Sequence, residues 1–184
     1  MKLVPKAQVM DTQSVERSLL RVSHQIIEKN PGDSGLCLIG IKTRGIPLAY
    51  RIAANIKNIT GNDIPVGELD ISLYRDDLTA ISDSPIVSQT KIDFDVTGKT
   101  VVLVDDVIFT CRTARAAIDA VVSLGRPKRI QLFCLIDRGH AEFPIRTTFV
   151  GKNIPTSLDE AVSVKLDETD GETSVTICQR VDKQ

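Results

Sequence analysis

The feature that most constrains this chain is a run of four apolar residues at 101–104 that ends directly in two aspartates, Asp105 and Asp106. Valine and leucine side chains without polar alternation are typical of a strand that is buried on both faces, as in the centre of a parallel sheet. Apolar residues at helical spacing follow from 112 to 124, and Gly125 ends that pattern. A buried strand that leads into a helix is the basic unit of an α/β fold.

The same pattern recurs along the chain. We predict helices at 12–29, from the Pro47 region to Gly61 and at 112–124, strands at 36–41, 66–73, 101–104 and 130–136, and shorter strands near 149–150, 161–166 and 174–178. This order predicts a largely parallel central sheet flanked by helices. Without repeats or linker-like segments, residues 1–184 are predicted to form a single domain, with a small hood made mainly by the C-terminal part, about 137–184.

Composition excludes few functions. Hydrophobic residues make up 42% and charged residues 26% of the chain, which is typical of a globular protein, and the formal charge of −1 neither demands nor excludes a nucleic-acid partner. No stretch resembles a signal peptide or a membrane span, so we expect a cytoplasmic protein without a membrane partner. Cys37, Cys134 and Cys178 lie in apolar runs and are predicted to be buried thiols.

The segment from Asp105 to Thr113 carries the chemistry. Two adjacent carboxylates after a buried strand repel each other unless hydroxyls or a cation compensate them. Thr110, Arg112 and Thr113 fall at the start of the next helix, where free amides, hydroxyls and a guanidinium can hold a phosphate. Helix capping explains the threonines but not the carboxylates. Together they suit a ribose 5-phosphate, which has a diol at one end and a phosphate at the other.

This segment, V-V-L-V-D-D-V-I-F-T-C-R-T, resembles the motif of type I phosphoribosyltransferases that binds phosphoribosyl pyrophosphate (PRPP). The resemblance implies that Asp105 and Asp106 hold the ribose hydroxyls. It also implies that the loop of Phe109, Thr110, Cys111, Arg112 and Thr113 surrounds the 5′-phosphate. Cys111 departs from the family, which has glycine there. Glycine permits positive φ or a close approach to phosphate, and cysteine achieves neither without cost.

A second predicted anion site follows the strand at 36–41. Thr43, Arg44 and Gly45 combine a hydroxyl, a guanidinium and backbone amides before a helix, and the family resemblance assigns this loop to the pyrophosphate. Arg44 is therefore a catalytic candidate together with the two aspartates. The segment at 68–78 resembles the entrance to the family's mobile catalytic loop, from which Arg75 would reach the pyrophosphate.

The last buried strand leads to Asp137 and Arg138, where the family recognises its base. The stretches at 141–146 and 151–157 resemble the pyrimidine operon attenuation regulators more closely than purine or orotate enzymes. This narrower resemblance implies a uracil phosphoribosyltransferase that makes uridine monophosphate (UMP), with Mg²⁺ carried mainly by PRPP and no firm protein ligand.

The regulators also bind a stem-loop in the messenger RNA of their operon. Matching positions here are Arg21, His24, Lys29, His140, Arg146 and Lys152. Two positions depart from the family: Ala141 replaces an arginine, and Leu20 stands where a polar residue is expected. The resemblance also implies a homodimer or a larger homo-oligomer.

Two alternatives remain open from the sequence. One is an RNA-binding regulator with weak or lost catalysis that senses nucleotides through the PRPP site, which Cys111 favours. The other is transfer to a different base, which the hood sequence disfavours. A P-loop is excluded because position 93 is aspartate and Gly98-Lys99-Thr100 precedes its strand rather than following it. A receiver-type domain does not explain the loops at 42–45 and 110–113.

Overall fold

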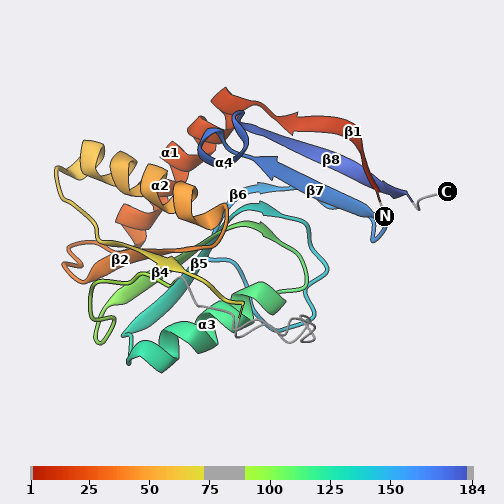
Figure 1. Ribbon diagram of the computed structural model, residues 1–184. Helices are drawn as coiled ribbons and strands as arrows, with labels where there is room; N and C mark the ends of the chain where they lie inside the picture. The colour runs from red at the N-terminus through yellow and green to blue at the C-terminus, as the bar shows by residue number, and fades with distance from the viewer. Residues whose placement is uncertain (1, 73–89, 182–184) are drawn as a thin grey trace.

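The computed structural model describes residues 2–72 and 90–181. The predicted contact of Arg75 with pyrophosphate therefore lies outside the described residues. Figure 1 shows a central sheet between two layers of helices, with a smaller sheet at one end.

The central sheet is parallel throughout and has the order β3-β2-β4-β5-β6. Its strands are β2 (Leu36–Ile41), β3 (Val66–Leu69), β4 (Thr100–Ile108), β5 (Arg129–Asp137) and β6 (Phe149–Asn153). The chain builds outward from β2 to β3, then returns to the other side of β2 for β4. The order therefore reverses between β2 and β4, and such a reversal opens a crevice at the carboxyl ends of the strands.

Both faces of this sheet are covered. Helices α1 (Thr12–Lys29) and α2 (Gly45–Thr60) lie on one face and α3 (Arg112–Leu124) on the other (Figure 1). The side chain of Asp11 caps α1 by accepting a hydrogen bond from the Ser14 amide at 2.8 Å. Gly61 ends α2 in the left-handed conformation that the sequence predicted for a glycine stop.

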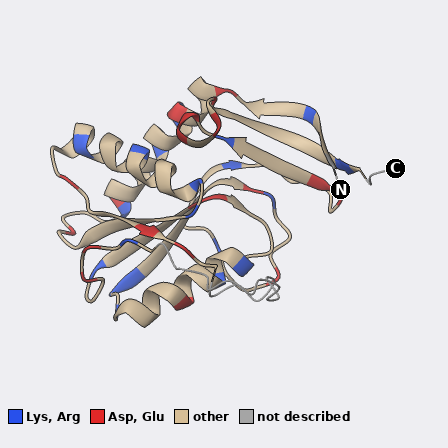
Figure 2. Ribbon diagram, viewed as in Figure 1, with Lys and Arg blue, Asp and Glu red and all other residues tan. Residues whose placement is uncertain are grey.

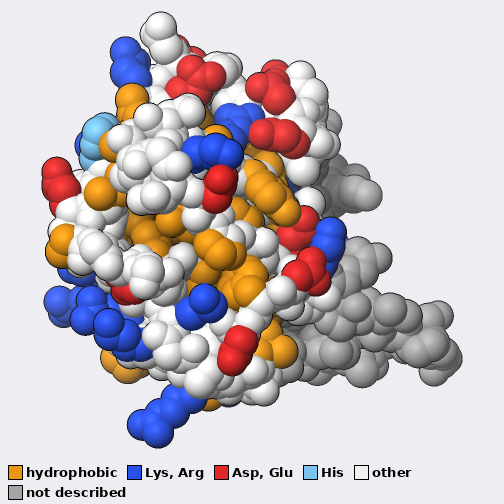
Figure 3. All heavy atoms as spheres, turned by 90° about the vertical axis from the view of Figure 1, so that its left-hand side faces the viewer, with side chains coloured by type: hydrophobic (Ala, Val, Ile, Leu, Met, Phe, Trp, Pro, Cys, Tyr) orange, Lys and Arg blue, Asp and Glu red, His pale blue; other side chains and the backbone are white. Residues whose placement is uncertain are grey.

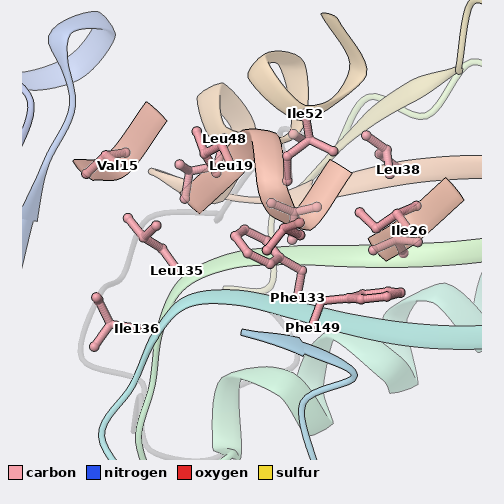
Figure 4. Close-up of a cluster of buried hydrophobic side chains, with 14 of the residues drawn as sticks. Val15, Leu19, Ile26, Leu38, Leu48, Ile52, Phe133, Leu135, Ile136 and Phe149 are labelled. Atoms are coloured by element: carbon pink, nitrogen blue, oxygen red, sulfur yellow. The ribbon is translucent and has the colours of Figure 1, made fainter. Parts of the chain in front are cut away.

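The main core lies between α1, α2 and the sheet. Leu19 and Ile26 of α1 and Ile52 of α2 face Phe133 and Phe149 of the sheet (Figure 4). This explains why the apolar positions of both helices repeat at intervals of three and four residues. A second cluster on the opposite face joins α3 to the sheet through small side chains such as Ala117 and Ala120.

The small sheet is antiparallel and has the order β1-β8-β7. It combines β7 (Glu160–Lys165) and β8 (Ser174–Val181) with β1 (Lys2–Met10), and the short helix α4 (Asp167–Asp170) precedes β8. The C-terminal strands fall in the predicted hood, but the third strand comes from the N-terminus, where no element was predicted. Val164 and Val175 share the main core with α1 and α2, so the two sheets pack against each other.

Several strand boundaries differ from prediction, and two of these differences affect the carboxyl end of the central sheet. Strand β4 continues through Asp105 and Asp106 to Ile108, because its backbone remains paired with β5 as far as Asp137. Strand β3 ends at Leu69, which leaves Asp70 directly at its carboxyl end. The prediction of a strand to residue 73 was therefore too long, and the prediction of an end at residue 104 was too short.

We expect Phe133→Ala to lower the free energy of unfolding by about 3–5 kcal/mol, because the ring is fully buried and leaves a cavity. Urea unfolding measures the free energy of unfolding of the variant and of the native protein. Val122→Ala, at a side chain that is 55% exposed on α3, is the control and should change stability by less than about 0.5 kcal/mol. Equal small effects from both substitutions would contradict the assigned core.

Candidate active site

A cleft of about 320 Å³ opens at the carboxyl ends of β2, β3 and β4. Its lining comes from three separate segments of the chain: Lys42 and Thr43 after β2, Asp70, Ile71 and Ser72 after β3, and Asp105, Asp106, Val107 and Thr113 from β4 and the start of α3. Four residues selected from the sequence, namely Thr43, Asp105, Asp106 and Thr113, thus line one cleft. This is the crevice that the reversal of strand order predicts.

The two adjacent aspartates differ in environment. Asp105 is 8% exposed and its Oδ1 accepts a hydrogen bond from the Asp106 amide at 3.0 Å. Asp106 is half-buried, and its Oδ1 accepts from the Val107 amide at 2.9 Å. Each carboxylate is therefore held by the backbone of the following residue. Strand β4 is paired with β2 as far as Val104 and with β5 as far as Ile108, so the two aspartates stand where β4 leaves β2 but is still held by β5.

Asp70 is a buried member of the cleft that the sequence analysis did not select. It accepts hydrogen bonds from the amide and hydroxyl of Ser72 at 3.0 and 2.6 Å and lies 3.4 Å from the ammonium of Lys42. Burial acts to raise the pKa of Asp70, but the Ser72 hydrogen bonds and Lys42 outweigh burial and hold it below its ordinary value. An anionic carboxylate thus faces the same cleft as Asp105 and Asp106. Recognising that β3 ends at Leu69 would have revealed it.

The loop at 109–113 takes the conformation that a glycine would favour. Cys111 has φ 68° and ψ 7°, in the left-handed region, and directly precedes α3. Its side chain is 4% exposed, and its Sγ lies 3.6 Å from the carbonyl oxygen of Ile145. Burial, followed by the charge of Asp137, raises the pKa of the Cys111 thiol, which argues against a reactive thiolate.

The same loop is tied to the segment after β5. The Phe109 ring lies beneath the guanidinium of Arg138, 4.1 Å from its centroid, and meets the His140 ring edge-on at 5.4 Å. Arg112 donates from Nε and Nη2 to the carboxylate of Glu142 at 3.0 and 2.8 Å. These contacts fix the predicted phosphate loop against residues 138–145.

The predicted pyrophosphate loop lies on the other side of the cleft. Gly45 begins α2 beneath β4, and a Cβ atom there would lie 2.2 Å from the Val104 carbonyl oxygen, so only glycine fits. Thr43 lines the cleft, whereas Arg44 lies beside it. The Arg44 guanidinium donates from Nε and Nη2 to the carboxylate of Asp170 at 3.0 and 2.6 Å.

Arg138 does not line this cleft. It is 4% exposed, and it donates to the Thr156 hydroxyl at 2.9 Å and to the Glu160 carbonyl at 2.6 Å. Burial, together with nearby Arg180, lowers its pKa. Asp137 accepts from the Gly139 amide at 2.8 Å. Contact of either residue with uracil stays a prediction.

The cationic positions predicted for RNA lie on the surface in two groups. Arg21 and Lys152 line a groove of about 310 Å³ together with Arg17 of α1. Lys29 lines a pocket of about 350 Å³ with Lys128 and Arg129 at the start of β5. His24, His140 and Arg146 are also exposed.

Comparison with known proteins agrees with this geometry. A model of the phosphoribosyl transferase domain matches residues 6–169. The chain is 58% identical to the Bifunctional protein PyrR of Pelotomaculum thermopropionicum and 57% identical to that of Thermus thermophilus. These matches cover 95% of this chain, and 96% and 97% of the two relatives. The chain belongs to the PyrR family of phosphoribosyltransferases.

Solved structures support the fold. A hypoxanthine phosphoribosyltransferase of Trypanosoma cruzi superposes with a TM-score of 0.75 at 16% identity and covers 96% of each chain. A hypoxanthine-guanine phosphoribosyltransferase of Bacillus anthracis gives 0.68 at 17% identity, with 97% of this chain and 100% of that chain covered. The type I phosphoribosyltransferase fold predicted from the sequence is therefore confirmed.

Within residues 2–72 and 90–181, no group of three or more histidine, cysteine, aspartate or glutamate side chains is arranged to hold a metal ion. In the same residues, no helix combines the length and apolar character needed to cross a membrane.

We expect Cys111→Gly to stay within about 1 kcal/mol of the native stability, because relief of left-handed strain offsets lost burial and added chain entropy. Cys111→Val should destabilise by more than about 1 kcal/mol, since a β-branched residue tolerates this φ poorly. Urea unfolding tests both. A valine variant as stable as the native chain would show that the loop does not need this conformation.

Proposed function

We propose that this phosphoribosyltransferase joins uracil to the ribose phosphate of PRPP, giving UMP and pyrophosphate. The observation that carries the proposal is the cleft that gathers Thr43, Asp105, Asp106 and Thr113 from separate strand ends. Family membership supports phosphoribosyl transfer, and the resemblance of the segments at 141–146 and 151–157 to the pyrimidine regulators supports uracil as the acceptor.

In the proposed reaction, N1 of uracil attacks C1 of the ribose while the bond from C1 to the pyrophosphate oxygen breaks, and the proton of N1 passes to solvent. The transition state has oxocarbenium character, as at other anomeric centres. Asp105 and Asp106 hold the ribose hydroxyls and place negative charge near the developing cation. The loop at 109–113 binds the 5′-phosphate, and Thr43, Arg44 and Gly45 bind the pyrophosphate. The protein acts mainly by orienting reactants and balancing charge.

Magnesium bound to PRPP would neutralise pyrophosphate charge during its departure. Asp70, Asp105 and Asp106 bring carboxylate oxygen atoms, the ligand type that Mg²⁺ prefers, to the cleft in which the metal–PRPP complex would bind. We assign the metal mainly to the substrate, because no three acidic, histidine or cysteine side chains among the described residues are arranged to hold it.

We propose that Asp137 and Arg138 frame the uracil. Because the guanidinium of Arg138 is engaged by Thr156 and the Glu160 carbonyl, its contribution is to fix this segment rather than to donate to the base. The same guanidinium lies over the Phe109 ring. It therefore also links residues 137–138, which we propose bind the base, to the loop at 109–113, which we propose binds the 5′-phosphate.

A second proposed activity is regulation of a pyrimidine operon through an mRNA stem-loop. Arg21 donates to the carbonyls of Val150 and Gly151, and Lys152 donates to the Val9 carbonyl at 3.0 Å. These partners are neutral. Among the described residues, neither cation forms an ion pair with a carboxylate, so both charges remain to attract phosphate.

The second cationic group lies at the edge of the central sheet where the parallel strands begin. Figure 3 looks onto that side of the molecule and shows lysine and arginine side chains gathered along one border of an apolar centre. In Figure 2 the blue segments at the start of β5 mark the same border. Lys29, Lys128 and Arg129 line the pocket there. We propose that RNA follows α1 between the two cationic groups.

Location and assembly follow from this proposal. A regulator of nascent transcripts would act in the cytoplasm. We expect a homodimer or a larger homo-oligomer, for which Leu20 and Tyr50, 45% and 48% exposed on α1 and α2, are candidate contacts.

We expect Asp105→Asn and Asp106→Asn each to lower kcat/KM for UMP formation by about 10- to 100-fold, because each removes a charged acceptor for a ribose hydroxyl. Asp119→Asn is the control, since this exposed carboxylate pairs with Arg115 on α3 outside the cleft. Unchanged turnover in both cleft variants would refute the assignment. Nucleotide-dependent RNA binding without any native turnover would instead favour the regulator with lost catalysis.

We expect Arg21→Ala and Lys152→Ala each to weaken binding of a pyrimidine-operon stem-loop by about tenfold and to reduce the salt dependence by about one phosphate contact. Lys165→Ala is the control, because its ammonium is compensated by Glu172 at 2.6 Å. Filter binding at several salt concentrations provides the measurement. A salt slope that changes only in the control would exclude this surface.

A further inference from the structure

Helix α4, at the end of the part of the chain that matches the family model, holds α2 through two bidentate ion pairs. Arg44 pairs with Asp170, and Arg51 pairs with Glu168 through contacts of 2.8 and 2.7 Å. The two arginines are seven residues apart and so lie on the same side of α2. Arg44 follows the predicted pyrophosphate loop directly, whereas Arg51 is two helical turns away from it.

The contacts of Asp170 hold the Arg44 guanidinium in one orientation. Its Oδ2 accepts from Arg44 Nε at 3.0 Å, from the Leu166 amide at 3.0 Å and from the Thr169 hydroxyl at 2.7 Å, and its Oδ1 accepts from Arg44 Nη2 at 2.6 Å. The side chain of Asp170 is 19% exposed and that of Arg44 is 34% exposed. Fork-to-fork pairing of this kind fixes direction as well as distance.

The pairing leaves one side of the guanidinium for a ligand. Asp170 engages the edge formed by Nε and Nη2, and no described residue accepts a hydrogen bond from Nη1. The hydrogen bonds to Asp170, followed by the charges of Asp170 and Asp106, raise the pKa of Arg44 against the opposing effect of burial, so its guanidinium stays cationic.

We infer that Asp170 is a positioning residue for pyrophosphate, acting through Arg44. The carboxylate holds the guanidinium at the border of the cleft, so that PRPP binds a cation that is already oriented. The small sheet and α4 thereby contribute to substrate binding, although neither lines the cleft. This inference rests on the proposed role of Arg44 in binding pyrophosphate.

The test compares binding of PRPP with binding of UMP by calorimetry in the presence of Mg²⁺. UMP retains the ribose, the 5′-phosphate and uracil but lacks the pyrophosphate. We expect Asp170→Asn to weaken PRPP binding by about tenfold, the size of one charge-assisted hydrogen bond, and to leave UMP binding unchanged. The KM for PRPP should rise by a similar factor, while the KM for uracil should not change.

Glu168→Gln is the matched control. It weakens the other bidentate pair of α4, but its partner Arg51 faces the groove between α1 and α2 rather than the cleft. PRPP binding should therefore match the native protein. If Glu168→Gln weakens PRPP binding as much as Asp170→Asn, α4 acts only through general packing and the inference is wrong. The same conclusion follows if Asp170→Asn weakens UMP and PRPP binding equally.

Arg44→Ala separates the inference from the proposed function. Weak PRPP binding in Arg44→Ala with native binding in Asp170→Asn would retain the pyrophosphate loop and reject the role of Asp170. Native binding in both variants would reject the loop assignment itself. Tighter PRPP binding in Asp170→Asn would mean that Asp170 competes with the substrate, which also overturns positioning. We expect the double variant to bind no more weakly than Arg44→Ala, because the aspartate acts only through the arginine.

Discussion

The parallel pairing of β2, β3 and β4 is the constraint on which the site depends. Parallel strands bring their carboxyl ends to one edge, and the reversal of order between β2 and β4 leaves a crevice there. The close approach of Gly45 to the Val104 carbonyl sets the separation of two walls of this crevice. One cleft is consequently lined by carboxylates, hydroxyls and a lysine. They come from three chain segments that are far apart in the sequence.

Rigidity around the cleft comes from buried polar contacts rather than from the sheet alone. Arg138 is almost fully buried, yet its guanidinium is satisfied by Thr156 and the Glu160 carbonyl and lies against Phe109. Within the described residues, every buried side-chain nitrogen or oxygen has a hydrogen-bond partner. A buried arginine without such partners would be costly, so this network orders the proposed phosphate loop at 109–113 together with residues 137–138, which are proposed to bind the base.

The small sheet packs against the helices that carry both proposed sites, namely α2 beside the cleft and α1 with its cationic surface. Its strands share the main core with α1 and α2. Asp170 and Glu168 of α4 form ion pairs with Arg44 and Arg51 at α2. Helix α1 presents its apolar side to this core and its cations to solvent near β6. The proposed nucleotide cleft and the proposed RNA surface are therefore both built on elements that pack around one core.

The sequence alone determined the local elements and the principal motif. Apolar periodicity predicted α1, α2 and α3, the uninterrupted valines predicted a central strand, and the mismatch of Cys111 with the family's glycine identified a position that has positive φ. These signals depend on neighbours close in the chain. Only the tertiary structure decided that residues 2–10 join β8, that Asp70 lies beside Lys42, and that Arg44 pairs with Asp170, 126 residues away. Such pairings follow from packing between distant segments, and no local pattern encodes them.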